Sequence, residues 1–380
     1  MSPLTETEPW RSVATLNTGS ATAPANISKQ LRTQLCERVA LTLNVSPKVT
    51  NVERCRFDDL RSRLYCWGSS MGMRFFAKVF LEELCRFGSP SMVPTKEGIF
   101  RNFEVRSVED QIDTEWNATN QLKALAGLAN IPAPVAKSHT AKTIVWEEAG
   151  GRRLDYFVAW SRLTDPKGSA TAAAMFSAGA WLRKVHDAFP PREEELDFSG
   201  LIETIPNLVQ GEPSYKYARI VTKLLERALV IAGGTGKLLV PVVFSHGDFC
   251  LPNLMWDKKL TQLSIFDFEN SGHRSICHDL ATIVFSLRGS LLYPLIPKPV
   301  VVSSEKSFWA GYGSITSEMF VCIDALVSFR IFFGLLARLS TRKKRRGWLA
   351  GLTALAYRAL LEDYVITRRL GIPAGFGAPR

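Results

Sequence analysis

The chain has 380 residues, of which 46% are hydrophobic and 22% are charged, and its formal net charge is +11. This is the composition of a globular protein, and the length is sufficient for two lobes. The seven cysteines are scattered, without a C-x-x-C pair. They argue against a disulfide framework or a zinc site and predict reduced thiols in a cytoplasmic protein.

The first part of the chain is predicted to be a tail followed by a β-rich region. Residues 1–26 are small and polar and lack the basic and apolar segments of a signal peptide, so we expect a flexible tail. Helical periodicity covers residues 27–43, and three strands are predicted at 49–57, 63–67 and 74–80. The third strand carries Lys78 in an apolar run, which is where kinase folds place their phosphate-binding lysine. The alternative is an exposed lysine on an edge strand.

A lysine in that role needs a carboxylate partner, and a helix predicted at 108–128 offers four acidic residues (Glu109, Asp110, Asp113 and Glu115). Leu122 and Leu125 follow Glu115 by about two and three helical turns, so the leucines could be buried while Glu115 points at Lys78. Glu109 is the alternative partner. Residues 81–104, between strand and helix, form an insertion without an assigned structure.

Two motifs in the second half carry the chemistry. His246-Gly247-Asp248 is followed by Asn253, and Asp267-Phe268-Glu269 comes fourteen residues after Asn253. Phosphoryl transfer from a nucleoside triphosphate needs a carboxylate that accepts the substrate's hydroxyl proton, and an amide and a carboxylate that hold the metal.

The segment between the two motifs predicts a hairpin. Strands are expected at 253–256 and 260–268 with a polar turn at 257–259, which returns Asp267 close to Asn253. The two oxygen ligands could then share a Mg2+ ion, which prefers oxygen. The alternative is a turn that carries solvated acids.

The chain after residue 152 is predicted to be mostly helical, with long helices at 170–189, 214–231, 308–339 and 348–369. The apolar stretch 319–339 is interrupted by Asp324, Arg330 and Arg338, so we expect a buried helix rather than a transmembrane segment. The basic run 342–346 is interpreted as a solvated link between helices. The alternative is a surface that binds nucleic acid or anionic lipid.

The pattern H-G-D-x-x-x-x-N followed by D-F-E resembles the aminoglycoside phosphotransferase and choline kinase family of small-molecule kinases. The resemblance covers roughly residues 50 to 290. His278-Asp279-Leu280-Ala281 resembles the family's Y-D-L-A and implies that Asp279 braces the catalytic loop. Glu115-Trp116-Asn117-Ala118 resembles its E-W-x-A-L, and the strand 143–148 with the following Ala149-Gly150-Gly151 resembles the hinge between lobes.

The resemblance implies an α+β, protein-kinase-like fold with a β-rich N-lobe at 27–149 and a helical C-lobe at 150–380 that holds the catalytic loop and the substrate site. ATP would bind between the lobes, with its adenine on the backbone around Glu147 and Glu148. Lys78, steadied by Glu115, would hold the α- and β-phosphates. The remaining roles are Mg2+ binding by Asn253 and Asp267, proton acceptance by Asp248, and shaping of the loop by His246.

The sequence therefore predicts an ATP-dependent phosphotransferase that acts on a hydroxyl of a small molecule such as a sugar, an amino alcohol, a nucleoside or an antibiotic. The basic charge is unfavourable for a polycationic aminoglycoside, whose pocket would be acidic, although net charge does not fix the charge of a pocket. One alternative is a catalytically weak nucleotide-binding protein, but all four key positions (Lys78, Asp248, Asn253 and Asp267) are present. Another is a basic binder that uses residues 342–346. Without an interleaved aromatic platform we do not expect nucleic acid binding, whereas weak contact with a membrane surface stays open.

Overall fold

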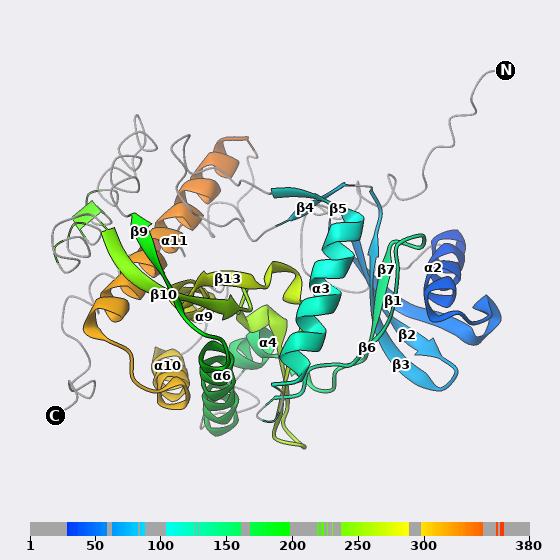
Figure 1. Cartoon of the computed structure of the whole chain (residues 1–380), viewed down its shortest axis with the longest axis horizontal. Coiled ribbons are helices and arrows are strands. Elements are labelled where there is room, and N and C mark those ends of the chain that lie inside the picture. Colours follow the sequence, from blue (N-terminus) through cyan, green and yellow to red (C-terminus); the bar gives the residue numbers. More distant parts are fainter. Residues whose placement is uncertain are drawn as a thin grey trace. The chain divides into compact units, whose positions relative to one another are not determined.

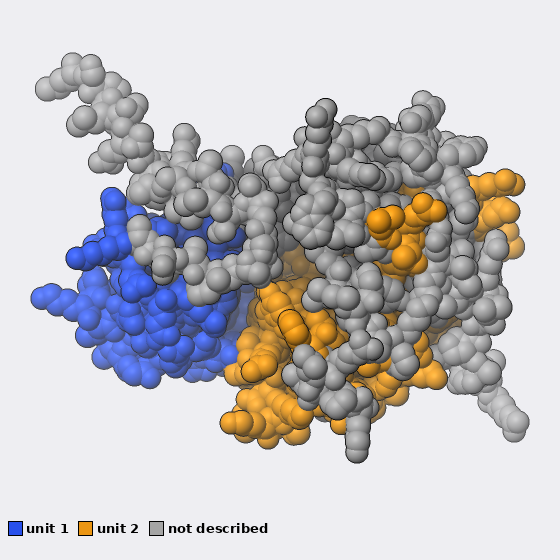
Figure 2. Space-filling model, turned by 180° about the vertical axis from the view of Figure 1, so that it is seen from behind, with its two compact units in different colours: residues 1–88, 103–124, 131–149 blue, residues 89–102, 125–130, 150–380 orange. Residues whose placement is uncertain are grey.

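The computed structural model describes residues 29–58, 63–87 except 83, 104–160 except 126 and 128, 168–197, 237–288 and 298–344, with a few positions at 219–230 and 355–360. The chain divides into two compact units (Figure 2). Unit 1 comprises residues 1–88, 103–124 and 131–149, and unit 2 comprises 89–102, 125–130 and 150–380. The predicted tail 1–26 and most of the helices predicted at 214–231 and 348–369 lie outside the described residues.

Unit 1 contains a five-stranded antiparallel sheet with the order β1-β2-β3-β7-β6 and a separate β4–β5 hairpin (Figure 1). Its elements are α2 (Lys29–Leu43), η1 (Pro47–Val49), β1 (Thr50–Asp58), β2 (Arg63–Ser70), β3 (Met73–Phe80), β4 (Leu84–Phe87), β5 (Glu104–Ser107), α3 (Val108–Lys123), β6 (Pro134–Ser138) and β7 (Thr143–Glu147). The structure contains the three strands expected at 49–57, 63–67 and 74–80 and the strand expected at 143–148.

Strand β3 lies at the centre of this sheet, and its side chains alternate between the two faces. Ala77 and Val79 pack in the core that α2 covers. Phe80, on the opposite face, packs against Ile112 of α3. Period-2 alternation therefore turns Lys78 toward the face that α3 covers.

Helix α3 begins where Ser107 caps it, because the Ser107 Oγ accepts a hydrogen bond of 3.0 Å from the backbone N–H of Asp110. The buried positions of the helix include Ile112, Glu115 and Leu122, which recur at helical spacing and form the face toward the sheet. The helix ends at Lys123, earlier than the sequence predicted.

Unit 2 is mostly helical in its described part and contains two three-stranded sheets. One has the order β13-β10-β9 (Figure 1), and the other has the order β12-β11-β8. Helix α10 packs on α6, and α11 packs on α9. The elements are β8 (Arg152–Arg153), α4 (Leu154–Ala159), α6 (Ser169–Ala188), β9 (Arg192–Asp197), β10 (Lys237–Ser245), η2 (Leu251–Asn253), β11 (Leu254–Asp257), β12 (Gln262–Ile265), η3 (Phe268–Asn270), β13 (Gly272–Ser275), α9 (Ile276–Arg288), α10 (Lys298–Tyr312) and α11 (Ser317–Lys344).

The prediction of a single helix at 308–339 is wrong, because two helices, α10 and α11, occupy this segment. Helix α10 ends at Tyr312, and Gly313 follows with a left-handed backbone (φ +91°) and donates its N–H to the Trp309 carbonyl at 2.8 Å. A glycine in this conformation is a common helix terminator. None of the described helices, α11 included, is long and apolar enough to cross a membrane.

Candidate active site

A buried ion pair joins β3 to α3 in unit 1. The Lys78 Nζ donates to both carboxylate oxygens of Glu115 at 2.7 Å, and each side chain is only 1% exposed. Glu109 lies on the exposed side of α3, so Glu115 is the acid that pairs with Lys78. The geometry fixes the ammonium group beside the central strand of the sheet.

Such a pair is costly to bury, because both charges leave water, and it persists only with good geometry and additional hydrogen bonds. The aromatic rings of Tyr65 and Trp146 lie 5.8 Å from the Lys78 Nζ and add a favourable electrostatic contact. Lys78 is therefore not the exposed lysine of an edge strand that was the alternative. Its burial and pairing are consistent with a functional position.

The expected hinge residues are already engaged through their backbone N–H groups. The N–H of Glu147 donates to the Ala133 carbonyl at 3.0 Å, and that of Glu148 donates to the Arg74 carbonyl at 3.1 Å. The Glu148 carboxylate also accepts from Arg74 Nε at 2.8 Å. These two backbone N–H groups are therefore already used within unit 1.

The hairpin predicted between Asn253 and Asp267 is present in unit 2 but is shorter than predicted. β11 and β12 pair with Leu254 opposite Ile265, and the N–H of Phe266 donates to the Asn253 carbonyl at 3.2 Å. The second strand ends at Ile265, because Asp267 takes a left-handed conformation (φ +69°, ψ +59°) that aspartate tolerates better than most residues. The hairpin thus returns Asp267 to the level of Asn253.

The amide of Asn253 is oriented by Asp248. Its Nδ2 donates to the Asp248 carbonyl at 3.0 Å and to the Asp248 Oδ2 at 3.3 Å. Because the amide nitrogen is used in this way, the amide oxygen is the atom that remains for a cation. Asn253 is 7% exposed, and Asp248 and Asp267 are partly exposed.

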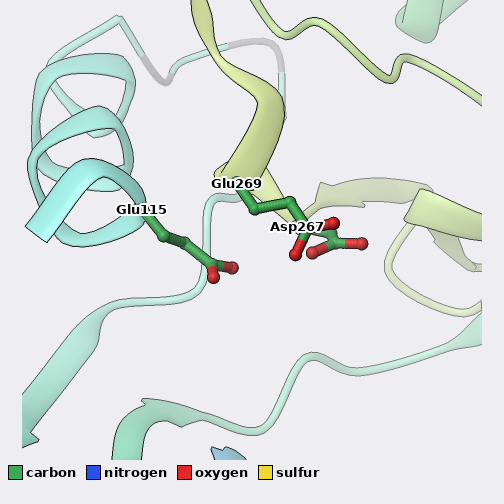
Figure 3. Close-up of side chains that lie close together, drawn as sticks. All are labelled: Glu115, Asp267 and Glu269. Atoms are coloured by element: carbon green, nitrogen blue, oxygen red, sulfur yellow. The ribbon is translucent and has the colours of Figure 1, made fainter. Parts of the chain in front are cut away.

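A second carboxylate accompanies Asp267. Figure 3 shows Asp267 and Glu269, from the turn after β12, with their carboxylates side by side. Oxygen atoms of the two groups lie within 4.8 Å of one another, and Glu269 is only 1% exposed. Sequence reasoning did not assign Glu269 to the site, although the third letter of D-F-E was the available signal. Carboxylate and amide oxygens are the ligands that Mg2+ prefers.

Asp279 holds the backbone that leads to Asp248. Its fully buried carboxylate accepts from the N–H of His246 at 3.0 Å and from the N–H of Gly247 at 2.9 Å. Gly247 has φ +79°, and a Cβ there would lie 1.9 Å from the Asn270 carbonyl oxygen, so only glycine fits. The backbone before Asp248 is therefore fixed by sterics and by two hydrogen bonds.

The charge of Asp279 is maintained by its neighbours. Burial alone raises the pKa of its carboxyl group, but the contact with His186 and the nearby histidines lower it from 3.8 to about 2. His186 Nε2 lies 3.5 Å from Asp279 Oδ2, and Nδ1 of the same ring lies 2.9 Å from the Tyr312 hydroxyl. His186 thus supports the loop through its contact with Asp279.

The surroundings of His246 do not suit a residue that accepts a proton from the substrate. It is fully buried, its Nδ1 accepts from the N–H of Asp248 at 3.3 Å, and its Nε2 lies 3.2 Å from the Phe266 carbonyl. Its ring contacts those of Phe268 and Trp181. Since both nitrogens are used within the protein, His246 connects the catalytic loop to the strand that leads to Asp267.

The model of the phosphotransferase enzyme family matches residues 95–294, slightly more than half of the chain. The chain belongs to the phosphotransferase enzyme family. The matched segment includes Glu115, both catalytic motifs and Asp279. The prediction of an enzyme that transfers phosphoryl groups is thereby confirmed. None of the curated proteins matches the sequence.

Solved structures resemble the chain at low sequence identity. The GDP and kanamycin complex of APH(2")-IIIa has a TM-score of 0.54 and 12% identity, over 88% of this chain and 99% of that one. The amicoumacin kinase hAmiN, in complex with AMP-PNP, Ca2+ and amicoumacin, has a TM-score of 0.50 and 13% identity, over 90% and 94%. The spectinomycin phosphotransferase APH(9)-Ia, with ADP and spectinomycin, has a TM-score of 0.50 and 12% identity, over 88% and 98%. The predicted α+β, protein-kinase-like fold of this phosphotransferase is confirmed.

Proposed function

We propose that this phosphotransferase uses ATP and Mg2+ to phosphorylate a hydroxyl group of a small molecule. The observation that supports the proposal is the arrangement in unit 2, where one loop and one hairpin bring Asp248, Asn253 and Asp267 together. In the proposal, Asp248 accepts the proton, and Asn253 and Asp267 provide oxygen ligands. The ion pair of Lys78 with Glu115 supplies the phosphate-binding cation that this chemistry needs.

The proposed reaction begins when the substrate hydroxyl lies against Asp248. The hydroxyl proton moves to the Asp248 carboxylate while the substrate oxygen forms a bond to the γ-phosphorus and the bond from that phosphorus to the β-phosphate oxygen breaks. ADP leaves with the bonding electrons. The protein contributes positioning and charge stabilisation rather than covalent chemistry.

The residues of unit 2 fit a Mg2+ ion. We propose that the Asn253 amide oxygen and the Asp267 carboxylate are its ligands and that the buried Glu269 adds negative charge beside Asp267. When bound, Mg2+ would supply positive charge that stabilises the negative charge of the transferring phosphoryl group. Lys78 would hold the α- and β-phosphates, and the backbone carbonyls of Glu147 and Glu148 would accept from the adenine amino group.

The acceptor is proposed only by class, as a hydroxyl-bearing small molecule. The similar structures bind kanamycin, amicoumacin and spectinomycin. This makes antibiotics the first compounds to test beside sugars and amino alcohols. A cytoplasmic location fits the ATP requirement and the free thiols of the six cysteines whose side chains are described.

The proposal is tested by a panel of hydroxyl compounds, with ATP consumption followed in the presence and absence of Mg2+. At least one acceptor should accelerate ATP consumption and become heavier by one phosphate in mass spectrometry. If the protein binds ATP–Mg2+ calorimetrically but modifies none of the panel, the alternative of a nucleotide-binding protein with weak catalysis is favoured.

A further inference from the structure

An arginine outside the family match reaches the catalytic loop through α9. Arg330 lies on α11, beyond the matched residues 95–294. Its Nη1 donates to the Thr282 Oγ1 at 2.6 Å, and its Nη2 lies 3.0 Å from the His278 Nδ1. His278 and Thr282 are one helical turn apart, so they share the face of α9 that receives the guanidinium.

This contact sets the tautomer of His278. A guanidinium only donates hydrogen bonds, so the Nδ1 that faces it must accept, and the ring proton must be on Nε2. His278 Nε2 lies 3.3 Å from the Gly247 carbonyl oxygen, to which it can therefore donate. The result is a continuous path from α11 to the residue before Asp248.

Burial and charge keep His278 in this neutral form. Burial and the positive charge of Arg330 lower the pKa of His278 from 6.5 to about 3, with a smaller contribution in the same direction from Arg274 on β13. Asp279 acts in the opposite direction. Near neutral pH the ring is thus a one-proton donor whose orientation is fixed.

The Gly247 carbonyl belongs to the peptide group that joins Gly247 to Asp248. The preceding N–H groups, of His246 and Gly247, are held by Asp279. His278 and Asp279, adjacent on α9, therefore hold both sides of the Gly247 backbone. Rotation of that peptide would displace Asp248, and a misplacement of about 1 Å can reduce a rate about 100-fold.

We propose that Arg330 is a positioning residue for the phosphoryl transfer: it holds His278 as the Nε2–H donor to the Gly247 carbonyl, and through that peptide it aligns Asp248. The inference rests on the proposed role of Asp248. A merely structural arginine would stabilise the fold without controlling either the His278 tautomer or the reaction rate.

The test uses the full chain labelled with 13C and 15N in histidine, of which it has five. His278→Gln assigns the His278 signal. In the wild type this ring should stay neutral, with the proton on Nε2, down to about pH 4. In Arg330→Met its titration should move up by about one pH unit or more, and both tautomers should appear. Arg330→Lys, which keeps the charge, should hold the titration near the wild-type value.

Kinetics provide the second readout, with ATP–Mg2+ as donor and water as acceptor, so that no identified substrate is needed. Arg330→Met should lower kcat about tenfold or more, leave the KM for ATP within about twofold, and move the acid limb of the pH profile upward. Arg330→Lys should recover part of kcat.

Arg288→Met is the matched control. Arg288 is a buried arginine on α9 that pairs with Glu305 at 2.8 Å. This variant should lose stability while its His278 spectrum and its kcat per folded molecule stay as in the wild type. An unchanged His278 spectrum in Arg330→Met, or an unchanged kcat, would overturn the proposal. A wild type that transfers no phosphoryl group contradicts the proposed function instead, and the spectrum still decides whether Arg330 controls His278.

Discussion

Replacement of Glu115 by leucine tests the ion pair on which the proposed role of Lys78 depends. Both side chains are 1% exposed, and the Lys78 ammonium contacts both oxygens of Glu115. Glu115→Leu leaves the ammonium buried without its carboxylate. Breaking a buried pair in this way costs about 3–5 kcal/mol. The free energy of unfolding in urea should fall by that amount.

The double variant Lys78→Met/Glu115→Leu separates stability from function. Replacing both charges with apolar side chains of similar volume should return the free energy of unfolding to within about 1 kcal/mol of the wild type, since such replacements are often neutral. ATP should nevertheless bind about 10- to 100-fold more weakly by calorimetry, because a hydrogen bond from a charged group contributes about 1.5–3 kcal/mol.

Two results would refute this reasoning. If the folded double variant binds ATP–Mg2+ with the wild-type Kd, Lys78 does not hold the phosphates. If Glu115→Leu unfolds at the wild-type urea concentration, the two charges do not depend on each other. Lys137→Met is the control for removing a lysine of unit 1, because Lys137 is partly exposed and pairs with Asp113 on the surface. It should change neither quantity by more than about 1 kcal/mol.

Three further predictions concern the loop that carries Asp248 and the proposed metal ligands. The pKa of Asp279 is about 2 in the fold and 3.8 ordinarily, so its charge contributes stability above about pH 4 that is lost as the pH falls toward 2. Urea unfolding across this range should show a loss of about 2 kcal/mol in the wild type that is absent in Asp279→Asn. Gly247→Ala places a methyl group 1.9 Å from the Asn270 carbonyl oxygen, at a residue with a left-handed backbone. It should lower the free energy of unfolding in urea by at least about 2 kcal/mol and remove most of the transferase activity. Wild-type activity in this variant would contradict the fixed loop. Asp267→Asn should raise the Mg2+ concentration for half-maximal activity at least about tenfold, since even substitutions beside metal ligands have that effect; an unchanged Mg2+ titration would remove Asp267 from the site.

The sequence predicted those parts of the site that local patterns determine. Lys78 lies in an alternating strand, and Asp248, Asn253 and Asp267 lie within a loop and hairpin whose spacing is visible in the chain. Residue spacing alone could not decide whether Glu115 or Glu109 pairs with Lys78. The cap at Ser107 fixes the phase of α3, and this phase buries Glu115 and exposes Glu109.

Other features depend on contacts between distant segments, which a linear pattern does not contain. Arg330 interrupts an apolar helix and was interpreted only as a charge unsuited to a membrane, whereas its partners lie about fifty residues earlier on α9. The end of α10 was missed because the apolar residues before Gly313 were joined to those that resume at Met319, although the left-handed conformation of Gly313 ends the helix. The engaged N–H groups of Glu147 and Glu148 follow from sheet pairing and a loop contact that the sequence does not show.

The central claim is that Asp248 accepts the proton of a hydroxyl group during transfer from ATP. The most direct measurement incubates the protein with γ-labelled ATP, Mg2+ and the panel of hydroxyl compounds, and compares the wild type with Asp248→Asn. The wild type should transfer the label to at least one acceptor, and Asp248→Asn should do so about 100- to 10,000-fold more slowly with an ATP Kd within about twofold of the wild type. Equal transfer by the two proteins would contradict the account.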